Sequence, residues 1–203
     1  MRFKDLIRLL ESDLFRHTGA TNVRLLLRNL ISNPGFKYSF WMRVTGYLGH
    51  HKLLRCSVYY ASAIILSHYR DKYGIDIPCN TVIECGLYIG HFGGIVVHEN
   101  TIIGNNFSIS QGVTIGQLNR GGRKGTPTIG DNVYIGPGAK VIGNVKIGNN
   151  VAVGANCVVT KDVPDNAVVV GVPGQIISYQ GAEGYLLNPV VLPSDHLRRQ
   201  ANA

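Results

Sequence analysis

The stretch from residue 128 to residue 159, TIGDNVYIGPGAKVIGNVKIGNNVAVGANCVV, repeats with a period of six residues. The same spacing of Ile and Val extends, with two interruptions, back to Ile77. An ordinary strand alternates with period two and a helix with a period of about 3.6. A period of six therefore indicates a short strand and a corner that recur together. The repeated positions are Ile77, Ile83, Ile89, Ile95, Ile103, Ile109, Ile115, Ile129, Ile135, Val141, Ile147, Val153 and Val159.

Three such repeats close a triangular coil, and stacked coils bury their branched side chains in one continuous core. Gly and Asn at the corners tolerate left-handed backbone angles, which suits the pairs Asn105-Asn106 and Asn149-Asn150. The sequence therefore predicts a mainly β protein, a parallel β-helix of hexapeptide repeats.

Two breaks interrupt the period. Two extra residues fall between Ile95 and Ile103, and fourteen residues separate Ile115 from Ile129 where six would do. The longer break, residues 116–127, is polar, basic and rich in glycine. An insertion in a solenoid projects from one edge as a loop, often on the binding face.

Residues 1–74 have a different pattern, with apolar residues at helical spacing between charged ones. The residues Asn33-Pro34-Gly35 form a break. The chain is thus predicted to contain an N-terminal helical segment (1–74), a β-helix domain (75–177) and a C-terminal tail (178–203). The expected helices cover about residues 6–14, 23–31, 38–48 and 53–69.

The composition limits the class of protein. Of 203 residues, 45% are hydrophobic and only 16% are charged, and 25 are glycine, which favours a repetitive β architecture. The net charge of +8 suits an anionic partner such as a phosphate-bearing cofactor or an acidic membrane surface, unless it is only a generally basic surface. No motif for nucleic-acid binding accompanies the charge, so no nucleic-acid partner is expected.

Targeting signals are also absent from the sequence pattern. The charged N-terminus does not resemble a signal peptide, and the longest apolar stretch, near residues 57–67, is far shorter than the ~20 residues of a membrane span. The four cysteines form no Cys-x-x-Cys pair and are interpreted as reduced thiols. We expect a cytoplasmic protein, with peripheral contact at the inner face of the membrane as an open alternative. The cysteines are Cys56, Cys79, Cys85 and Cys157.

Two histidines, His91 and His98, fall inside the repeat region. His91 is followed by Gly93-Gly94, which leave space beside the imidazole. Taken alone, such a histidine is more simply a solvent-exposed corner residue than a catalytic one.

Several blocks together change this interpretation, because they resemble the serine acetyltransferase branch of the hexapeptide-repeat acetyltransferases. The resemblance covers residues from about 34 to 177 and implies a left-handed coil, acetyl-CoA as co-substrate, no metal, and a homotrimer or a larger assembly. The matching blocks are residues 74–78 (GIDIP), 91–97 (HFGGIVV), 111–116 (QGVTIG) and 171–177 (GVPGQII).

The resemblance implies that His91 is the general base and that Asp76, fifteen residues earlier, orients it. A base suffices, because the thioester of acetyl-CoA is already activated toward direct attack by a hydroxyl. Asp76 also fits a simple turn residue before Pro78. Cys79 and Cys85 lie nearby, but buried packing explains them better than nucleophilic catalysis.

Cofactor binding is predicted from basic residues and from small ones. CoA carries several phosphate charges, which suit cationic side chains. In the family the pantetheine arm lies in a groove between neighbouring β-helices of the trimer, where backbone at small residues can line it. The basic candidates are Arg120, Arg123, Lys124, Lys140, Lys146 and Lys161, and the groove candidates are Gly116, Gly136, Ala139, Gly154 and Pro173.

The acceptor is predicted from two positions at which the sequence differs from the serine acetyltransferase pattern. Gly90 stands where the family has an aspartate, and Gly125-Thr126-Pro127 stands where it has Arg-His-Pro. Zwitterionic serine needs charged partners, so we predict instead a sugar hydroxyl of a capsular, exo- or O-antigen polysaccharide or its precursor. Gly90, Glu99 and Thr126 are the candidate acceptor-binding residues.

Three alternatives stay open at this point. A serine O-acetyltransferase of cysteine biosynthesis is the first of them. A metal enzyme of the γ-carbonic-anhydrase kind needs three histidine ligands, and the repeats supply only two. A non-enzymatic trimeric scaffold is the third.

Overall fold

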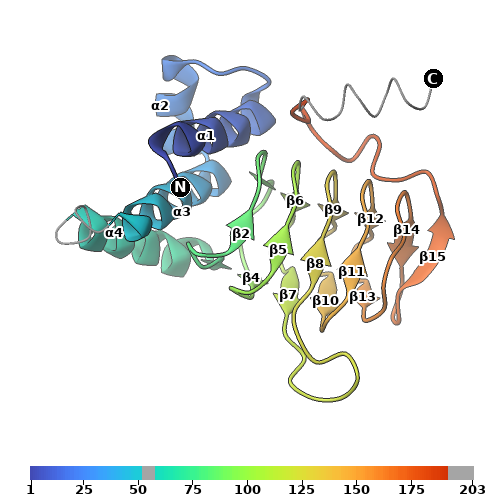
Figure 1. Cartoon of the computed structure of the whole chain (residues 1–203). Coiled ribbons are helices and arrows are strands. Elements are labelled where there is room, and N and C mark those ends of the chain that lie inside the picture. The colour runs from blue at the N-terminus through green and yellow to red at the C-terminus, as the bar shows by residue number, and fades with distance from the viewer. Residues whose placement is uncertain (52–57, 192–203) are drawn as a thin grey trace.

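The computed structural model describes residues 1–51 and 58–191. In these two ranges fifteen short strands form three sheets, and each sheet is one face of a triangular β-helix (Figure 1). Within each face, every strand pairs in parallel with strands one coil away, except the last pair, β14 and β15, which is antiparallel.

We call the three sheets faces A, B and C. Face A contains β1 (Ile75–Asp76), β4 (Ile95–Val97), β7 (Thr114–Gly116), β10 (Lys140–Ile142) and β13 (Val158–Val159). Face B contains β2 (Val82–Ile83), β5 (Ile102–Ile103), β8 (Thr128–Ile129) and β11 (Lys146–Ile147). Face C contains β3 (Tyr88–Ile89), β6 (Ser108–Ile109), β9 (Tyr134–Ile135), β12 (Ala152–Val153), β14 (Val168–Val170) and β15 (Gln175–Ser178).

The core consists of the stacked aliphatic side chains that the period of six predicts. All the repeated Ile and Val positions from Ile77 to Val159 are buried, none more than 5% exposed. Equivalent residues of neighbouring coils are in register, and Ile103, for example, pairs with Ile129. The predicted β-helix is therefore confirmed, and dry stacking of these side chains holds the coils together.

The shorter break in the period lies elsewhere than predicted. Asp76 is in register with Val96, and Val97 with Ile115, so the coil equivalent of Ile77 is Val97 and not Ile95. The side chains of Ile95 and Val97, at the two ends of β4, both point inward because a strand alternates with period two. A step of six residues from Ile89 therefore reaches Ile95, which is buried although it is not the equivalent position. The two extra residues therefore belong to the corner between β3 and β4, which carries His91.

The longer break forms the projecting loop that the sequence predicts. The chain leaves β7 at Gly116 and returns at Thr128, and Figure 1 shows the loop standing away from the coils. Leu118 and Gly125 exchange two backbone hydrogen bonds of 3.0 Å, which close the base of the loop as a short antiparallel bridge.

The part of the chain that the structure describes has four helices, which cover the end of the β-helix that begins with β1 (Figure 1). They are α1 (Phe3–Thr18), α2 (Val23–Ser32), α3 (Pro34–His50) and α4 (Val58–Tyr73). The helical segment is confirmed, although α3 begins earlier than predicted. Asn33 ends α2 and caps α3 by accepting from the Phe36 N–H, and Pro34 fits the first helical turn. Part of the fourth predicted helix, residues 53–57, lies outside the described residues.

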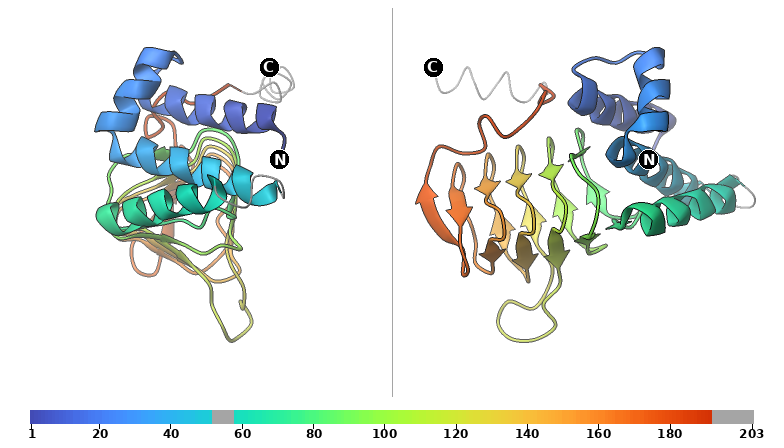
Figure 2. Two further views of the ribbon diagram at one scale, coloured as in Figure 1. Left: turned by 90° about the vertical axis from the view of Figure 1, so that its left-hand side faces the viewer. Right: turned by 180° about the vertical axis from the view of Figure 1, so that it is seen from behind.

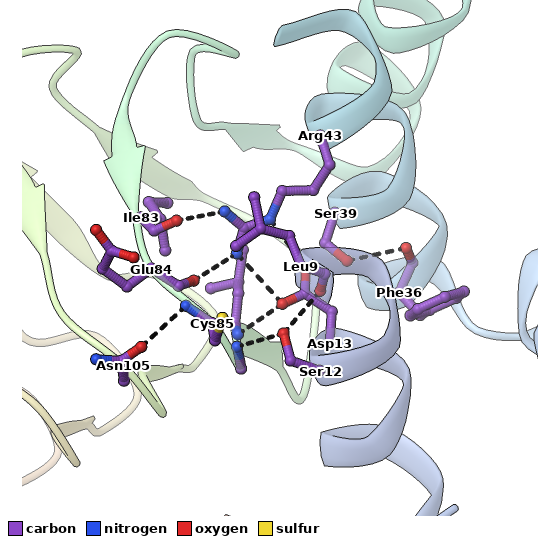
Figure 3. A network of polar contacts seen from close by, with 12 residues as sticks. Leu9, Ser12, Asp13, Phe36, Ser39, Arg43, Ile83, Glu84, Cys85 and Asn105 are labelled. Atoms are coloured by element: carbon purple, nitrogen blue, oxygen red, sulfur yellow. Dashed lines mark hydrogen bonds and ion pairs between the residues drawn. The ribbon is translucent and has the colours of Figure 1, made fainter. Parts of the chain in front are cut away.

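A buried ion pair fastens the helices to the first coil (Figure 3). Asp13 of α1 accepts two hydrogen bonds from Arg43 of α3, at 3.1 and 3.2 Å, and a third of 2.8 Å from the Leu87 N–H. Arg43 also donates to the carbonyl oxygens of Ile83 and Glu84. Burial raises the pKa of Asp13, and Arg43 opposes that effect. The pair therefore joins α1, α3 and the turn between β2 and β3.

Asparagines line the corner between faces B and C, which we call the asparagine corner. Asn106, Asn132, Asn150 and Asn166 have φ between 54° and 62°, the left-handed conformation predicted for the asparagine pairs. Their side chains bond along the stack, as Asn106 does to Asn132 at 2.9 Å.

The C-terminal segment returns along the asparagine corner toward the helices (Figure 2). Val190 donates to Asn106, and the Ala182 N–H donates to Asn150. The tail is therefore not a free appendage up to residue 191, the last that the structure describes.

The cysteines that the structure describes are Cys79, Cys85 and Cys157, all reduced, and burial raises the pKa of each thiol. Cys85 and Cys157 are buried, and Cys79 packs against the core, which agrees with the packing interpretation. Cys56 lies outside the described residues. No helix among the described residues is long and apolar enough to span a membrane.

Candidate active site at the glycine corner

Glycines occupy the corner between faces C and A, which we call the glycine corner. Gly74, Gly94, Gly112 and Gly138 lie one coil apart with φ of 60°, 65°, 72° and 72°. A Cβ on Gly94 would lie 3.5 Å from the Cα of Gly112, and one on Gly112 would lie 3.3 Å from the Cα of Gly138. The left-handed turn favours glycine at all four positions, and tight stacking adds to this at Gly112. The result is a strip of bare backbone.

His91 lies on this corner, in the loop between β3 and β4, and is exposed. Its neighbour Phe92 packs against Tyr73 of α4, with ring centroids 5.4 Å apart. On the other side, α3 comes so close that a Cβ on Gly35 would lie 2.1 Å from the carbonyl oxygen of Ile89. The two helices α3 and α4 therefore hold both ends of the short loop that carries the imidazole.

Asp76 lies on β1, the outermost strand of face A, and points outward between buried Ile75 and Ile77. Tyr38 of α3 fixes this strand, because its hydroxyl accepts from the Ile77 N–H and donates to the Ile77 carbonyl, both at 3.0 Å. Burial raises the pKa of Tyr38 to about 12, and the Asp76 carboxylate contributes to the shift. The phenol therefore stays protonated as a donor at neutral pH.

His91 and Asp76 lie on adjoining parts of the structure. The loop of His91 leads directly into β4, and β4 pairs with β1, which carries Asp76. The two side chains do not hydrogen bond to each other, and neither bonds to another side chain in the part of the chain that is described. Both are exposed and free to meet a ligand.

Backbone N–H groups at the corner differ in availability. The Gly112 N–H donates to the Gly93 carbonyl at 2.7 Å, so it is occupied. The N–H groups of Gly93 and Gly94 make no hydrogen bond within residues 1–51 and 58–191. Within the described residues, the segment at Gly93 and Gly94 therefore keeps unbonded N–H donors beside His91, and such donors can stabilise an oxyanion.

The basic residues predicted to bind phosphates are not equally free. Lys140 is half-buried on face A and donates to the Gly112 carbonyl and to the Thr114 hydroxyl at 3.1 Å. Arg123, in the projecting loop, pairs with Asp162 at 2.8 Å. The pKa of the Asp162 carboxyl is lowered chiefly by the hydrogen bond from the Lys146 N–H and less by Arg123. Lys124, in the same loop, is exposed.

The small residues predicted to line the cofactor groove follow face A and the glycine corner. Gly116 ends β7, Gly136 and Gly154 precede the turns into β10 and β13, and Pro173 lies in the bend before β15. The Ala139 side chain is fully buried in the core, so only its backbone can face a ligand.

The residues predicted to bind the acceptor do not gather around His91 within one chain. Glu99 accepts a 3.1 Å hydrogen bond from Asn80, and the Thr126 hydroxyl donates to the Asn100 carbonyl at 3.0 Å. Both lie at the corner between faces A and B, across face A from the glycine corner. Only Gly90 adjoins His91.

Sequence reasoning missed the residues that hold the site. Tyr38, Tyr73 and Phe92 act through contacts between the helices and the coils, which no spacing in the sequence reveals. Among the described residues, no group of three His, Cys, Asp or Glu side chains could hold a metal ion.

Comparison with known proteins places these features in a family. The family of bacterial transferase hexapeptide (six repeats) matches residues 126–161. A serine acetyltransferase of Staphylococcus aureus (strain Mu50) is 40% identical over 164 residues, which cover 77% of each chain.

Solved structures agree with this match. Soybean serine acetyltransferase complexed with serine is 33% identical, with a TM-score of 0.70 over 86% of this chain and 70% of that one. Serine acetyltransferase from Brucella abortus in complex with coenzyme A is 27% identical, with a TM-score of 0.72 over 88% and 70%. The coil is thus the left-handed β-helix expected, and acetyl-CoA is the co-substrate.

The predicted sugar acceptor is wrong, because these relatives are serine acetyltransferases and not polysaccharide acetyltransferases. The error came from giving Gly90 and Gly125-Thr126-Pro127 more weight than the match along the rest of the chain. Within one chain, Thr126 lies across face A from His91. The chain belongs to the serine acetyltransferase family of hexapeptide transferases and is an acetyl-CoA-dependent acetyltransferase.

Proposed function

We propose that the protein transfers the acetyl group of acetyl-CoA to the hydroxyl of L-serine. The observation that carries the proposal is the 40% identity to a serine acetyltransferase over 77% of the chain. The solved relative with serine bound supports the same acceptor, and the relative with coenzyme A bound supports the donor.

In the proposed reaction His91 is the general base. Its imidazole takes the proton of the serine hydroxyl as that oxygen attacks the thioester carbonyl. The tetrahedral intermediate collapses, the C–S bond breaks, and the proton on the imidazolium passes to the departing thiolate. The free N–H groups of Gly93 and Gly94 stabilise the oxyanion in this scheme.

Asp76 is the proposed partner that orients the imidazole and stabilises its charged form. The paired strands β1 and β4 support this role, because they keep the carboxylate and the loop of His91 on neighbouring coils. Tyr38 is a positioning residue for β1, since its hydroxyl bonds both backbone groups of Ile77.

Zwitterionic serine needs charged partners that Gly90 and Thr126 do not supply. Arg70, at the end of α4, is a candidate for the serine carboxylate. Its pKa is raised chiefly by its hydrogen bond to Asp71, and the Asp76 carboxylate contributes less. Glu99 is a candidate to bind the serine ammonium group. In this proposal it belongs to the neighbouring subunit of the one that supplies His91.

The separation of Glu99 and Thr126 from His91 across face A supports a homotrimer. In such an assembly the glycine corner of one subunit meets face A of the next, and acetyl-CoA lies between them. Candidates for the phosphates are the exposed Lys124 of the projecting loop and the Arg123–Asp162 pair, in which Asp162 lies at the corner between faces A and B. Lys140, already bonded to Gly112 and Thr114, fixes the corner instead.

A thiol-release assay with acetyl-CoA tests the acceptor. We expect CoA release to depend on L-serine, to saturate with it, and to yield one O-acetylserine per CoA by mass spectrometry. L-Threonine, which adds a methyl group beside the hydroxyl, is the matched control and should react more slowly. Release that does not exceed the rate without acceptor would refute serine as the acceptor.

A further inference from the structure

The net positive charge is confined to one part of the chain. Residues 1–74 contain twelve Lys and Arg against four Asp and Glu, whereas residues 75–203 contain eight of each. The whole net charge of +8 therefore belongs to the helical segment. A phosphate-bearing substrate in a groove of the β-helix does not account for this distribution.

Helix α2 has a row of apolar side chains that no other part of the described chain covers. Val23, Leu27 and Ile31 lie one turn apart and are 72%, 56% and 79% exposed. The buried Asn29 is on the other side of the helix, toward its packing partners α1 and α3. Figure 2 shows α2 at the outer edge of the helical segment. The exposed stripe is therefore not part of the core of this chain.

Cations border the stripe. Arg24 and Arg28 follow Val23 and Leu27 by one residue each and are exposed, so they lie at one edge of the stripe. Neither forms an ion pair with any carboxylate of the described residues. An apolar stripe edged by free arginines is the pattern of a helix that lies in a membrane interface.

The pattern continues onto α1. Ile7 and Leu10 of α1 line an apolar groove together with Val23 and Leu26 of α2. Glu11 also lines this groove, and Lys4 and Arg8 are two exposed cations of the same helix α1. We call this the α1–α2 surface, made of Lys4, Ile7, Arg8, Val23, Arg24, Leu27, Arg28 and Ile31.

We propose that the α1–α2 surface binds peripherally to an anionic lipid bilayer. The stripe enters the boundary between headgroups and acyl chains, and the arginines contact lipid phosphates. The inference is independent of the acceptor and of the catalytic assignment. A second copy of the chain fits this surface less well, because a symmetric contact would bring two segments of like charge together.

Cosedimentation of the full chain with vesicles tests the proposal. We expect binding to phosphatidylcholine vesicles that contain phosphatidylglycerol, weaker binding as salt is added, and little binding to phosphatidylcholine alone. The double variant Arg28→Glu/Ile31→Ser should lower the partition onto anionic vesicles by about an order of magnitude. Both side chains are exposed, so the fold should be kept.

The matched control is Lys161→Glu/Ile177→Ser, which makes the same changes at exposed positions at the far end of the β-helix. It should bind vesicles like the unmodified protein. Equal loss in both double variants would show that only net charge matters and would overturn the assigned surface. Absence of vesicle binding, with a smaller assembly of Arg28→Glu/Ile31→Ser in light scattering, would make the surface a contact between copies instead.

Discussion

At the residue scale, His17 shows how burial determines a protonation state. Its Nδ1 lies 3.2 Å from the Asn33 amide nitrogen, so the neutral ring accepts that hydrogen bond. The rings of Tyr88 and Phe36 lie 4.6 and 5.8 Å away. Burial lowers the pKa of His17 from 6.5 to about 4, and the nearby Arg16 cation adds to the shift.

This shift predicts a dependence of stability on pH. The unfolded chain protonates His17 as the pH falls through 6.5, whereas the folded chain resists protonation down to about 4. The contribution of His17 to the free energy of unfolding is therefore complete above pH 6.5. It is lost as the pH falls from 6.5 to 4, by at most ~3 kcal/mol. The variant His17→Phe should lack this part of the decline in urea unfolding measured across that range.

The control is His68→Phe, at an exposed position on α4. Its unfolding should follow the pH profile of the unmodified protein. A profile for His17→Phe that stays parallel to both would contradict the assigned buried neutral state.

Tyr38 is the residue whose hydroxyl fixes the first strand of face A. The variant Tyr38→Phe leaves the buried N–H and carbonyl of Ile77 without their partner. We expect a loss of ~1–3 kcal/mol in the free energy of unfolding, together with a lower kcat because β1 carries Asp76. Tyr60→Phe, at a side chain that is 62% exposed, should change stability by less than about 0.5 kcal/mol.

At the scale of elements, the glycine corner combines left-handed turns with close stacking of neighbouring coils at Gly112. Gly112 has φ of 72°, and a Cβ there would lie 3.3 Å from the Cα of Gly138. Gly121 in the projecting loop has φ of 81° but nothing within 4 Å. A side chain at either position would carry the cost of a left-handed backbone. Only at Gly112 would it also meet a neighbouring backbone atom.

Alanine at each position separates the two effects. Both variants carry the left-handed penalty of about 1–2 kcal/mol, but Gly112→Ala should lose ~1 kcal/mol more because backbone must move. Thermal unfolding of both proteins checks the difference. Equal losses would mean that the coils are free to adjust and that the corner is not closely stacked.

The junction between helices and coils depends on the ion pair of Asp13 and Arg43. Removing one partner, as in Asp13→Leu or Arg43→Met, leaves a buried charge and should cost ~3–5 kcal/mol. The double variant should lose clearly less than the sum of the two single losses, in a double-mutant cycle by urea unfolding. Additive losses would show that the two side chains act independently.

At the scale of the whole molecule, the sequence predicts the stack of coils because the same inward position recurs in every coil. The period also places the projecting loop correctly, since eight extra residues cannot fit inside a coil. It misplaces the short insertion at His91, because Ile95 and Val97 both point inward.

Other parts of the architecture leave no periodic signal. The return of residues 179–191 along the asparagine corner depends on contacts with Asn106 and Asn150 that are distant in sequence. The positions of Tyr38 and Phe92 depend on how the helices dock. Acceptor choice was predicted wrongly because the charged side chains missing at Gly90 and Gly125-Thr126-Pro127 were given more weight than the match along the rest of the chain.

The most direct test of the catalytic assignment compares two histidines of the repeat region. His98 is half-exposed and accepts a 3.2 Å hydrogen bond from the Asn100 N–H at the corner opposite His91. With acetyl-CoA and L-serine, His91→Ala should lower kcat/KM by about 10²–10⁴, whereas His98→Ala should stay within a fewfold of the unmodified protein. An unchanged kcat/KM in a folded His91→Ala protein would contradict the role of this corner as the active site.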